Sequence, residues 1–454
     1  MSETKETETI KEPSVAGKFY PADTVDLINH LEMIKNASKN FYKITTRAVI
    51  VPHAGWVFSG KLAYEGLHLL DKNIKNLFIF APAHQAAIEG LALTSYSQWK
   101  TPLGEIQINQ DINKDLAENF GAAYIDEALE KEHSIEVQLP FIQDLFDEIN
   151  IIPVLIGKAR PDDILKILNK YYPDKENGFI ISSDLSHFLT DENARRMDFD
   201  AAQMIETGDI RNFRYEMACG AIGVTGLVEF ANINKYSLIR VGMFNSSETT
   251  NDKSRVVGYG SWFLYEGEKN ELISKYHSDF VIGVCKIVLE SAFRKTDIKI
   301  VYPQVFDELG ASFVTLEKNG DLRGCIGSIL AYRPLINDLI ENTKNAAFKD
   351  TRFSPLTAEE FPQTKINVSL LSVPRRIFFN GEEDLLSKIT PNLDGIIIRD
   401  GDKQAVYLPS VWEVLPEKRE FLNTLKVKAG FEKDYFSDTL EAYRFETIYI
   451  KEDE

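Results

Sequence analysis

Short apolar runs alternate with amphipathic segments along the first half of the chain. Apolar residues recur at helical spacing around 164–171 and 194–205, between runs rich in β-branched residues. These runs read RAVIV (47–51), NLFIF (76–80), INIIPVLIG (149–157), GFIIS (178–182), IRVGMF (239–244) and GSWFLY (260–265). Buried strands that alternate with helices are typical of a sheet covered on both faces. The pattern therefore predicts an α/β domain with a sheet flanked by helices.

A polar stretch, EGEKNELISK (266–275), separates this domain from a different pattern and is the predicted linker. An amphipathic helix is expected from about Glu271 to Arg294, and another near 335–348. The strand-like runs FVTLEK and DLRGCIGSI flank Asn319-Gly320. This dipeptide is the strongest short hairpin signal because both central residues must take positive φ. With the further strand INVSLLSV, the pattern predicts an α+β domain with antiparallel strands over residues 276–454.

Composition and charge limit the classes of partner. The 454 residues are too many for one core, so two domains are expected. The net charge of -18 argues against nucleic acid as a partner, and no apolar run reaches membrane-spanning length. Residues 1–12 are polar and lack the core of a signal peptide, which predicts a disordered terminus. Three cysteines form no disulfide framework, which predicts a cytoplasmic location. From the charge and the apolar runs we expect a protein that binds neither nucleic acid nor membrane.

Histidines follow several of the predicted strands. His53 and His84 come after RAVIV and NLFIF, while Asp184 and His187 come after GFIIS. In open α/β sheets ligands bind beyond the carboxyl ends of the strands, so these side chains are expected at one edge. His133 lies in EHSIEVQLPF, which alternates like a strand but could also form a short helix. In the helical case, Glu136 would share its face.

Cys219 precedes a segment with the pattern of a helix, and a helix N-terminus favours the thiolate. Neutral imidazoles together with a thiolate suit iron, copper or zinc and disfavour magnesium or calcium. Each residue also has an ordinary structural interpretation. These are a hydrogen-bonded histidine, a small buried cysteine and a surface carboxylate at Glu136. Spacing alone leaves both interpretations open.

Several ordered motifs resemble the Memo family over roughly residues 10–265, the domain that we place at 13–265. They are SVAGKFYPAD (14–23), VPHAGWVFSG (51–60), APAHQ (81–85), EHSIEVQLPF (132–141), SSDLSHF (182–188) and CG (219–220). The resemblance implies the fold of class III non-haem-iron extradiol dioxygenases. It also implies iron or copper bound by His53, His84 and Cys219, while the donor chemistry leaves zinc possible. Asp184 and His187 match further pocket residues of the family, and His133 lies in another matching motif; we assign catalytic roles to all three.

One departure weakens the transfer of dioxygenase activity. Extradiol dioxygenases complete their iron site with a carboxylate, where this pattern offers Cys219. A thiolate is softer and favours copper(I) more than a carboxylate does. In addition, Gln85 stands where many relatives have a second histidine.

The second half resembles the AMMECR family over roughly residues 271–454. The motifs are LRGCIGSI (322–329), AAFKDTRFSPLT (346–357), INVSLLSVP (366–374), DGIIIRDG (394–401) and YLPSVWEVLP (407–416). The two families are proteins B and A of the AmmeMemoRadiSam system, whose third member, a radical-SAM protein, is the implied partner. A fusion holds the pair at high effective concentration, as expected for domains that act together.

Arg323 and Cys325 form a second candidate site. Alternate residues of a strand share a face, and a guanidinium beside a thiol favours the thiolate. The adjacent Gly324 and Gly327 would let a substrate or partner backbone approach. The same glycines equally fit a tightly packed hairpin with a buried cysteine.

Three hypotheses of function follow. The first is a metal-dependent oxidoreductase acting on an unknown small-molecule or protein substrate, with His133 or His187 as general acid or base. The second is a non-catalytic binding or scaffold protein with a dioxygenase-like pocket. The third is a zinc hydrolase in which Glu136 or Asp184 acts as the base.

Overall fold

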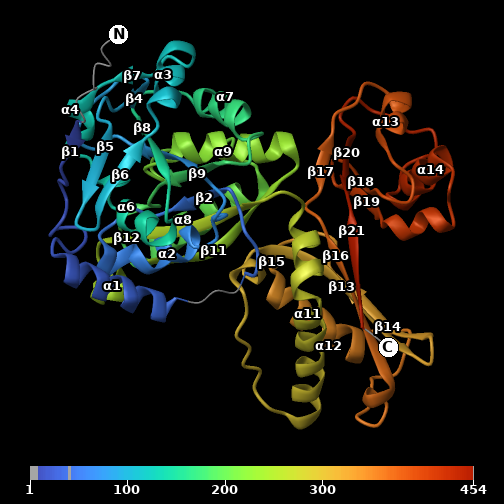
Figure 1. Cartoon of the computed structure of the whole chain (residues 1–454). Coiled ribbons are helices and arrows are strands. Elements are labelled where there is room, and N and C mark those ends of the chain that lie inside the picture. Colours follow the sequence, from blue (N-terminus) through green and yellow to red (C-terminus); the bar gives the residue numbers. More distant parts are fainter. Residues whose placement is uncertain (1–8, 39–41, 453–454) are drawn as a thin grey trace. The chain divides into compact units, whose positions relative to one another are not determined.

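The computed structural model describes residues 9–38 and 42–452, and the chain divides into two compact units (Figure 1). The first comprises residues 1–267 with 303–305, and the second comprises 268–302 with 306–454. Each unit is described by itself. Within the described residues, no helix is both long enough and apolar enough to cross a membrane.

The first unit is built on a sheet whose centre is parallel, in the order β6-β8-β3-β9-β2. These strands are β6 (Gly104–Ile108), β8 (Asn150–Ile156), β3 (Asn76–Pro82), β9 (Asn177–Ser182) and β2 (Ala48–Val51). β12 (Val256–Tyr265) pairs with β2 in antiparallel orientation, and β11 (Ser237–Asn245) pairs with β12. Residues of β2 and β9 are buried throughout, which explains their continuous apolar sequence.

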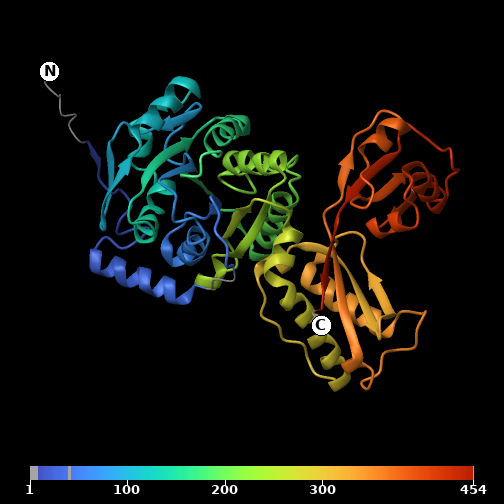
Figure 2. The same ribbon diagram turned by 45° about the vertical axis from the view of Figure 1, so that its right-hand side comes forward.

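Helices cover both faces of this sheet, which confirms the predicted α/β class. On one face, α7 (Pro161–Tyr171), α8 (Asp191–Thr207) and α9 (Ala221–Asn234) share a buried cluster with Phe78 and Phe80. On the other lie α1 (Thr24–Ala37) and α2 (Lys61–Leu67) (Figures 1 and 2). At Gly66 of α2, an added Cβ would lie 2.3 Å from Ser261 Oγ, so only glycine permits this close approach.

The predicted disordered terminus is partly ordered. Residues 1–8 lie outside the described residues, but Ile10–Lys11 forms β1 and pairs with β5 (Gln98–Thr101). The physical reason is the Lys11 ammonium, which is buried and lies 2.9 Å from the Glu136 carboxylate. A buried charge needs such a partner, so the segment is held in place.

The second unit contains two antiparallel sheets, in agreement with the predicted α+β class. The first has the order β14-β13-β16-β21, and the second has the order β17-β20-β18-β19. Their strands are β13 (Leu309–Lys318), β14 (Asp321–Gly327), β16 (Thr364–Leu371), β21 (Thr447–Lys451), β17 (Arg375–Ile377), β20 (Glu441–Phe445), β18 (Gly395–Asp400) and β19 (Lys403–Tyr407). Asn319 and Gly320 have φ of 57° and 86°, which confirms the predicted hairpin turn.

Helices of the second unit also match the predicted pattern. α12 (Leu335–Phe348) packs on β13, and α11 (Lys269–Arg294) packs on α12, β16 and β21. The start of α11 lies inside the predicted linker 266–275, which is therefore mostly helical. Glu268 and Glu271 form a capping box there, and Leu272 and Ile273 are buried. Against the second sheet, Trp412 of the 3-10 helix Pro409–Glu413 stacks on Phe421 of α14 (Lys418–Lys428).

A buried carboxylate in α8 supports the segment that leads to His187. Asp198 Oδ1 accepts a hydrogen bond of 3.0 Å from the Ser186 N–H, and an added Cβ at Gly258 would lie 2.1 Å from Oδ2. Burial outweighs the hydrogen bonds from Ser186 and raises the pKa of Asp198 from 3.8 to about 6. Asp198 therefore loses its proton at a higher pH in the folded chain than in the unfolded chain.

We predict that Asp198→Asn removes a pH-dependent loss of stability. Between pH 4 and pH 6 the folded chain binds more protons than the unfolded chain, so the free energy of unfolding falls as pH rises, by about 3 kcal/mol in total. An asparagine amide does not lose a proton in this range, so its variant avoids this loss of stability. It also keeps an oxygen that can accept from the Ser186 N–H. Urea unfolding should show the variant more stable than wild type at pH 8, with a smaller difference at pH 5. The exposed Asp200→Asn is the control, and parallel pH profiles for Asp198→Asn and wild type would refute the assignment.

Candidate metal centre

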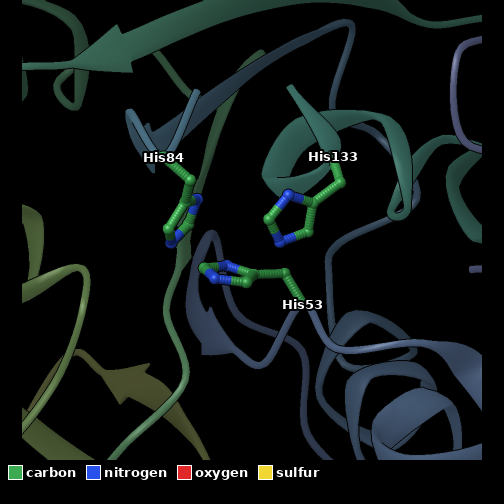
Figure 3. A group of neighbouring side chains, drawn as sticks. All are labelled: His53, His84 and His133. Atoms are coloured by element: carbon green, nitrogen blue, oxygen red, sulfur yellow. The ribbon is translucent and has the colours of Figure 1, made fainter. Parts of the chain in front are cut away.

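Three histidines converge at the carboxyl edge of the sheet. His53 follows β2, His84 follows β3, and His133 opens the short helix α5 (His133–Glu136). One nitrogen of each imidazole lies within 4.8 Å of the other two. The ring centroids are 5.1 Å apart for His53 and His84 and 4.8 Å apart for His84 and His133. Figure 3 shows the three rings turned toward a common point.

Glu132 holds two of these rings by their Nδ1 atoms. Its carboxylate Oε1 lies 3.0 Å from His84 Nδ1 and 3.2 Å from His133 Nδ1, and Oε2 accepts from the His84 N–H at 2.7 Å. Burial raises the pKa of Glu132, but the hydrogen bonds from His133 and His84 outweigh it and hold that pKa well below its usual range. An ionised carboxylate only accepts hydrogen bonds, so both rings carry the proton on Nδ1. Their Nε2 lone pairs are then the ones available to a ligand.

His53 is held as the same tautomer by a hydroxyl. Its Nδ1 lies 2.9 Å from Ser182 Oγ, and that hydroxyl donates its own hydrogen to the Ser134 carbonyl at 2.7 Å. The hydroxyl oxygen must therefore accept from His53 Nδ1–H. Burial, followed by the nearby His84 and His133, lowers the pKa of His53 well below its ordinary value. The ring is thus neutral, with Nε2 as its lone-pair atom, the form that binds metals.

Cys219 and Asp184 lie on the His53 side of the cluster. Cys219 Sγ is 3.3 Å from His53 Nε2 and accepts from the Asp184 N–H at 3.3 Å. Asp184 Oδ1 accepts from the His53 N–H at 2.8 Å. Burial raises the pKa of the Cys219 thiol, and Asp184 adds to that rise. Among the described residues, the group with all ligand atoms within 4.8 Å consists of the three histidines, so Cys219 is near one of them rather than within the group.

The remaining predicted pocket residue, His187, lies beside the histidine cluster. His187 begins β10 (His187–Leu189), where its ring contacts Phe188, and its charge acts on His53 and Asp184 over a longer range. Phe188 has φ of 60°, which is rare for a bulky residue, and sits where the pairing of β10 with β12 shifts register. His187 is thus beside the cluster but outside it.

His133 and Glu136 both lie in α5, which confirms the helical alternative, but the Glu136 carboxylate contacts the N-terminal segment instead of the imidazoles. This carboxylate accepts hydrogen bonds from Lys11 Nζ, the Ser14 and Val15 N–H groups and the Tyr20 hydroxyl, at 2.9 to 3.0 Å. With its lone pairs engaged by the N-terminal segment, Glu136 is not placed to act as a catalytic base. It is a structural anchor instead, and the hydrolase hypothesis loses one of its two candidate bases.

Three residues that position the cluster were not singled out from the sequence. These are Glu132, Ser182 and Phe19, whose ring packs on His133 with centroids 4.6 Å apart. Each lies inside a quoted motif, and Glu132 directly precedes His133. A carboxylate adjacent to a candidate ligand histidine was the available signal, because ligand imidazoles commonly donate their second N–H to a carboxylate.

At the second candidate site, side chains cover the edge of β14 at Cys325. The Cys325 N–H donates to Asp350 Oδ2 at 2.9 Å, and its carbonyl accepts from Arg352 Nη2 at 3.1 Å. Asp350 and Arg352 also pair with each other, so together they satisfy one residue of β14 as a neighbouring strand would. Thr315 Oγ1 donates to the Cys325 thiol at 3.3 Å.

The strand is irregular at Arg323, so the predicted shared face of Arg323 and Cys325 stays a prediction. The pairing of β13 with β14 passes from Leu316–Gly324 to Glu317–Leu322, so Arg323 is the extra residue of a bulge. A bulge breaks the alternation on which the prediction was based. The Arg323 guanidinium accordingly pairs with Glu360 at 2.9 Å.

Comparisons with known proteins agree with this division of the chain. A Memo-like protein family model matches residues 11–263, and an AMMECR1 family model matches residues 282–450. A MEMO1 family protein of Thermoplasma volcanium is 31% identical over 266 residues, which cover 56% of this chain and 97% of the relative. One from Aquifex aeolicus is 30% identical over 270 residues, covering 56% and 99%. The crystal structure of the uncharacterized protein PH0010 from Pyrococcus horikoshii matches at 27% identity, covering 38% of this chain and 89% of that one, with a TM-score of 0.34.

We predict that Glu132→Gln weakens metal binding about 10- to 100-fold, as expected when a group that orients ligand imidazoles is lost. With its oxygen in the place of Oε1, a glutamine turns its NH₂ toward the His84 and Gln85 N–H groups, so the side chain is displaced and no longer holds the two rings in place. Titration against a competing chelator would measure the affinity. The exposed Glu127→Gln removes the same charge away from the cluster and should leave affinity unchanged. Equal affinities for Glu132→Gln and wild type would show that Glu132 does not orient the ligands.

Proposed function

Because the chain belongs to the Memo family and continues into an AMMECR1 domain, we propose that its first unit is a metal-dependent oxidoreductase. In this proposal iron or copper is bound by His53, His84 and His133. The substrate is a small molecule or a protein that reaches the carboxyl edge of the sheet. The observation that carries the proposal is the common tautomer of the three rings, each with Nδ1 hydrogen-bonded and Nε2 available.

The donor set fits such a metal. Neutral imidazole nitrogens suit iron, copper and zinc, whereas magnesium and calcium prefer oxygen ligands. Three protein ligands leave coordination positions open to a substrate, as catalytic sites do. A redox metal bound there would supply electron transfer to or from a coordinated substrate, and support for iron or copper over zinc comes from the resemblance to extradiol dioxygenases.

The chain's own residues would orient the substrate and manage protons. Asp184 is buried beside His53, and burial raises the pKa of its carboxyl, so this group can hold a proton close to the ligands. His187, on β10, can exchange protons with a substrate that enters from its side. The Cys219 thiol borders the His53 ring, where it would limit the space next to a bound metal.

We extend the proposal to a partner. The AmmeMemoRadiSam resemblance implies a radical-SAM protein, and the fusion in one chain is consistent with a pathway in which both domains serve the same substrate.

The third ligand is tested by comparing His133→Ala with Cys219→Ser in protein purified anaerobically without an affinity tag. We expect His133→Ala to lose most of its metal, because one of three converging nitrogens is removed, and Cys219→Ser to retain it. Elemental analysis of each variant gives the metal per chain. The exposed His68→Ala controls for loss of an imidazole elsewhere. Metal loss in Cys219→Ser but not in His133→Ala would instead support the ligand set that the family resemblance implies.

The identity of the metal separates the proposed oxidoreductase from the alternatives. We expect iron or copper in wild-type protein, with a paramagnetic resonance signal that changes on oxidation or reduction. Zinc alone would favour the hydrolase hypothesis, with Asp184 as the remaining base. Absence of metal from wild type and from every variant would favour a binding or scaffold protein.

A further inference from the structure

A cavity of about 520 Å³ lies at the carboxyl ends of β3 and β8, next to the candidate metal centre. Its volume is within the range of sites that enclose small ligands. Cys219 belongs to both places, because it lines the cavity and lies 3.3 Å from His53 Nε2. A molecule that fills the cavity as far as Cys219 therefore ends beside the His53 imidazole.

Most of the lining is apolar. Ala86 and Ile88 come from the loop after β3, Ile156 ends β8, Phe213 precedes α9 and Ile222 lies in its first turn. Water that leaves such a surface is replaced favourably by an apolar molecule, in proportion to the apolar area that is covered. The lining therefore binds a ligand through its apolar body.

One wall of the cavity is held firmly by backbone contacts. The loop after His84 is hydrogen-bonded to the end of β8, through Lys158 N–H to the Ile88 carbonyl at 2.9 Å and Gly157 N–H to the Gly90 carbonyl at 3.0 Å. An added Cβ at Gly157 would lie 2.2 Å from the Ile88 backbone, so the loop packs directly on a glycine. The cavity is thus preformed on this side, which reduces the entropy lost on binding.

The charged residues of the lining all have partners of opposite charge. Lys158 Nζ lies 3.4 Å from Glu89 Oε1, and Arg214 Nε lies 3.4 Å from Glu216 Oε2. The exposed fractions are 82% and 81% for the first pair and 65% and 66% for the second, so both pairs lie in solvent at the mouth. The rim therefore carries no net charge, and the rest of the lining contains no acidic or basic side chain.

We propose that this cavity binds an uncharged, mostly apolar small molecule, whose inner end lies between Cys219 and the metal centre. An ionic group inside the cavity would lose its hydration without gaining a partner of opposite charge. An ionic group at the mouth would meet pairs whose charges cancel, so neither sign is favoured. This inference rests on the proposed function, since it names the substrate class of the same site.

The test is calorimetric titration of the full chain, as purified and after chelation, with 4-phenylbutan-1-ol. The probes 4-phenylbutanoate and 4-phenylbutylamine carry a negative and a positive charge on the same body. We expect the alcohol to bind about tenfold more tightly than either ion, and the two ions to bind about equally, because the lining offers neither of them a free counter-charge. Affinity should also fall about fourfold for each CH₂ removed, in 3-phenylpropan-1-ol and 2-phenylethanol, since less apolar area is covered.

Breaking both ion pairs converts the neutral rim into a positive one. The double variant Glu89→Gln/Glu216→Gln leaves the two rim cations without their carboxylates. It should strengthen binding of 4-phenylbutanoate about fivefold and leave binding of the alcohol unchanged. The double variant Glu118→Gln/Glu192→Gln removes two exposed charges away from the cavity and is the matched control.

Variants that fill the cavity separate binding inside it from binding elsewhere. Thr225→Trp on α9 and Ala86→Trp on the loop each place a large ring in the lining, and both should weaken binding of the alcohol more than about tenfold. Two positions are used so that misfolding of one variant, detected by circular dichroism, leaves the other informative. Thr249→Trp, at an exposed position outside the lining, should bind the alcohol as wild type does.

Binding of either ion as tightly as the alcohol, or unchanged binding of the alcohol in the tryptophan variants of the lining, would overturn the proposal. Its failure is distinguishable from failure of the proposed function, because the titration is repeated without metal. Metal bound by the histidines with no binding of the alcohol refutes the cavity alone. Binding of the alcohol in a chain that never binds metal refutes the metal centre alone.

Discussion

The candidate centre depends on one buried negative charge, that of Glu132. A carboxylate without solvent is costly unless hydrogen-bond donors surround it. Here the donors come from two places in the sequence, the turn after β3 and the first turn of α5. The same bonds that stabilise the charge fix the positions and tautomers of His84 and His133. Because the orientation is set by protein groups, the three nitrogens converge without requiring a ligand to gather them.

Helix α5 is only four residues long, yet both of its sides are held by buried carboxylates. Glu132 precedes it and faces the imidazoles, while Glu136 ends it and faces the N-terminal segment. Phe19, from that same segment, packs on the His133 ring. A helix of this length is not stable by itself. Contacts with segments distant in the sequence therefore fix both ends of the helix, and these contacts also fix the position of His133.

Much of the fold could be predicted from the sequence, whereas the partners of the site residues could not. Continuous apolar runs identified β2, β3, β8 and β9, and the rule for open sheets placed His53 and His84 at one edge. Glu132 and Glu136 look equivalent in the sequence, since each is an acid near His133. Only the tertiary structure shows that one contacts imidazoles and the other contacts Lys11. In the second unit, the bulge at Arg323 similarly depends on pairing that alternation alone does not reveal.

The strand order also determines when the centre can be assembled during synthesis. β2, which leads to His53, is among the first strands made, but its neighbours in the sheet are β9 and β12, at residues 177–182 and 256–265. Strand pairing over such separations in the sequence forms slowly, because loop closure precedes any gain from the contacts. The strand that leads to His53 therefore lacks its full set of sheet neighbours until nearly the whole first unit has been synthesised. The convergence of the three imidazoles is consequently a late event, which occurs when synthesis of the chain has already reached the AMMECR1 domain.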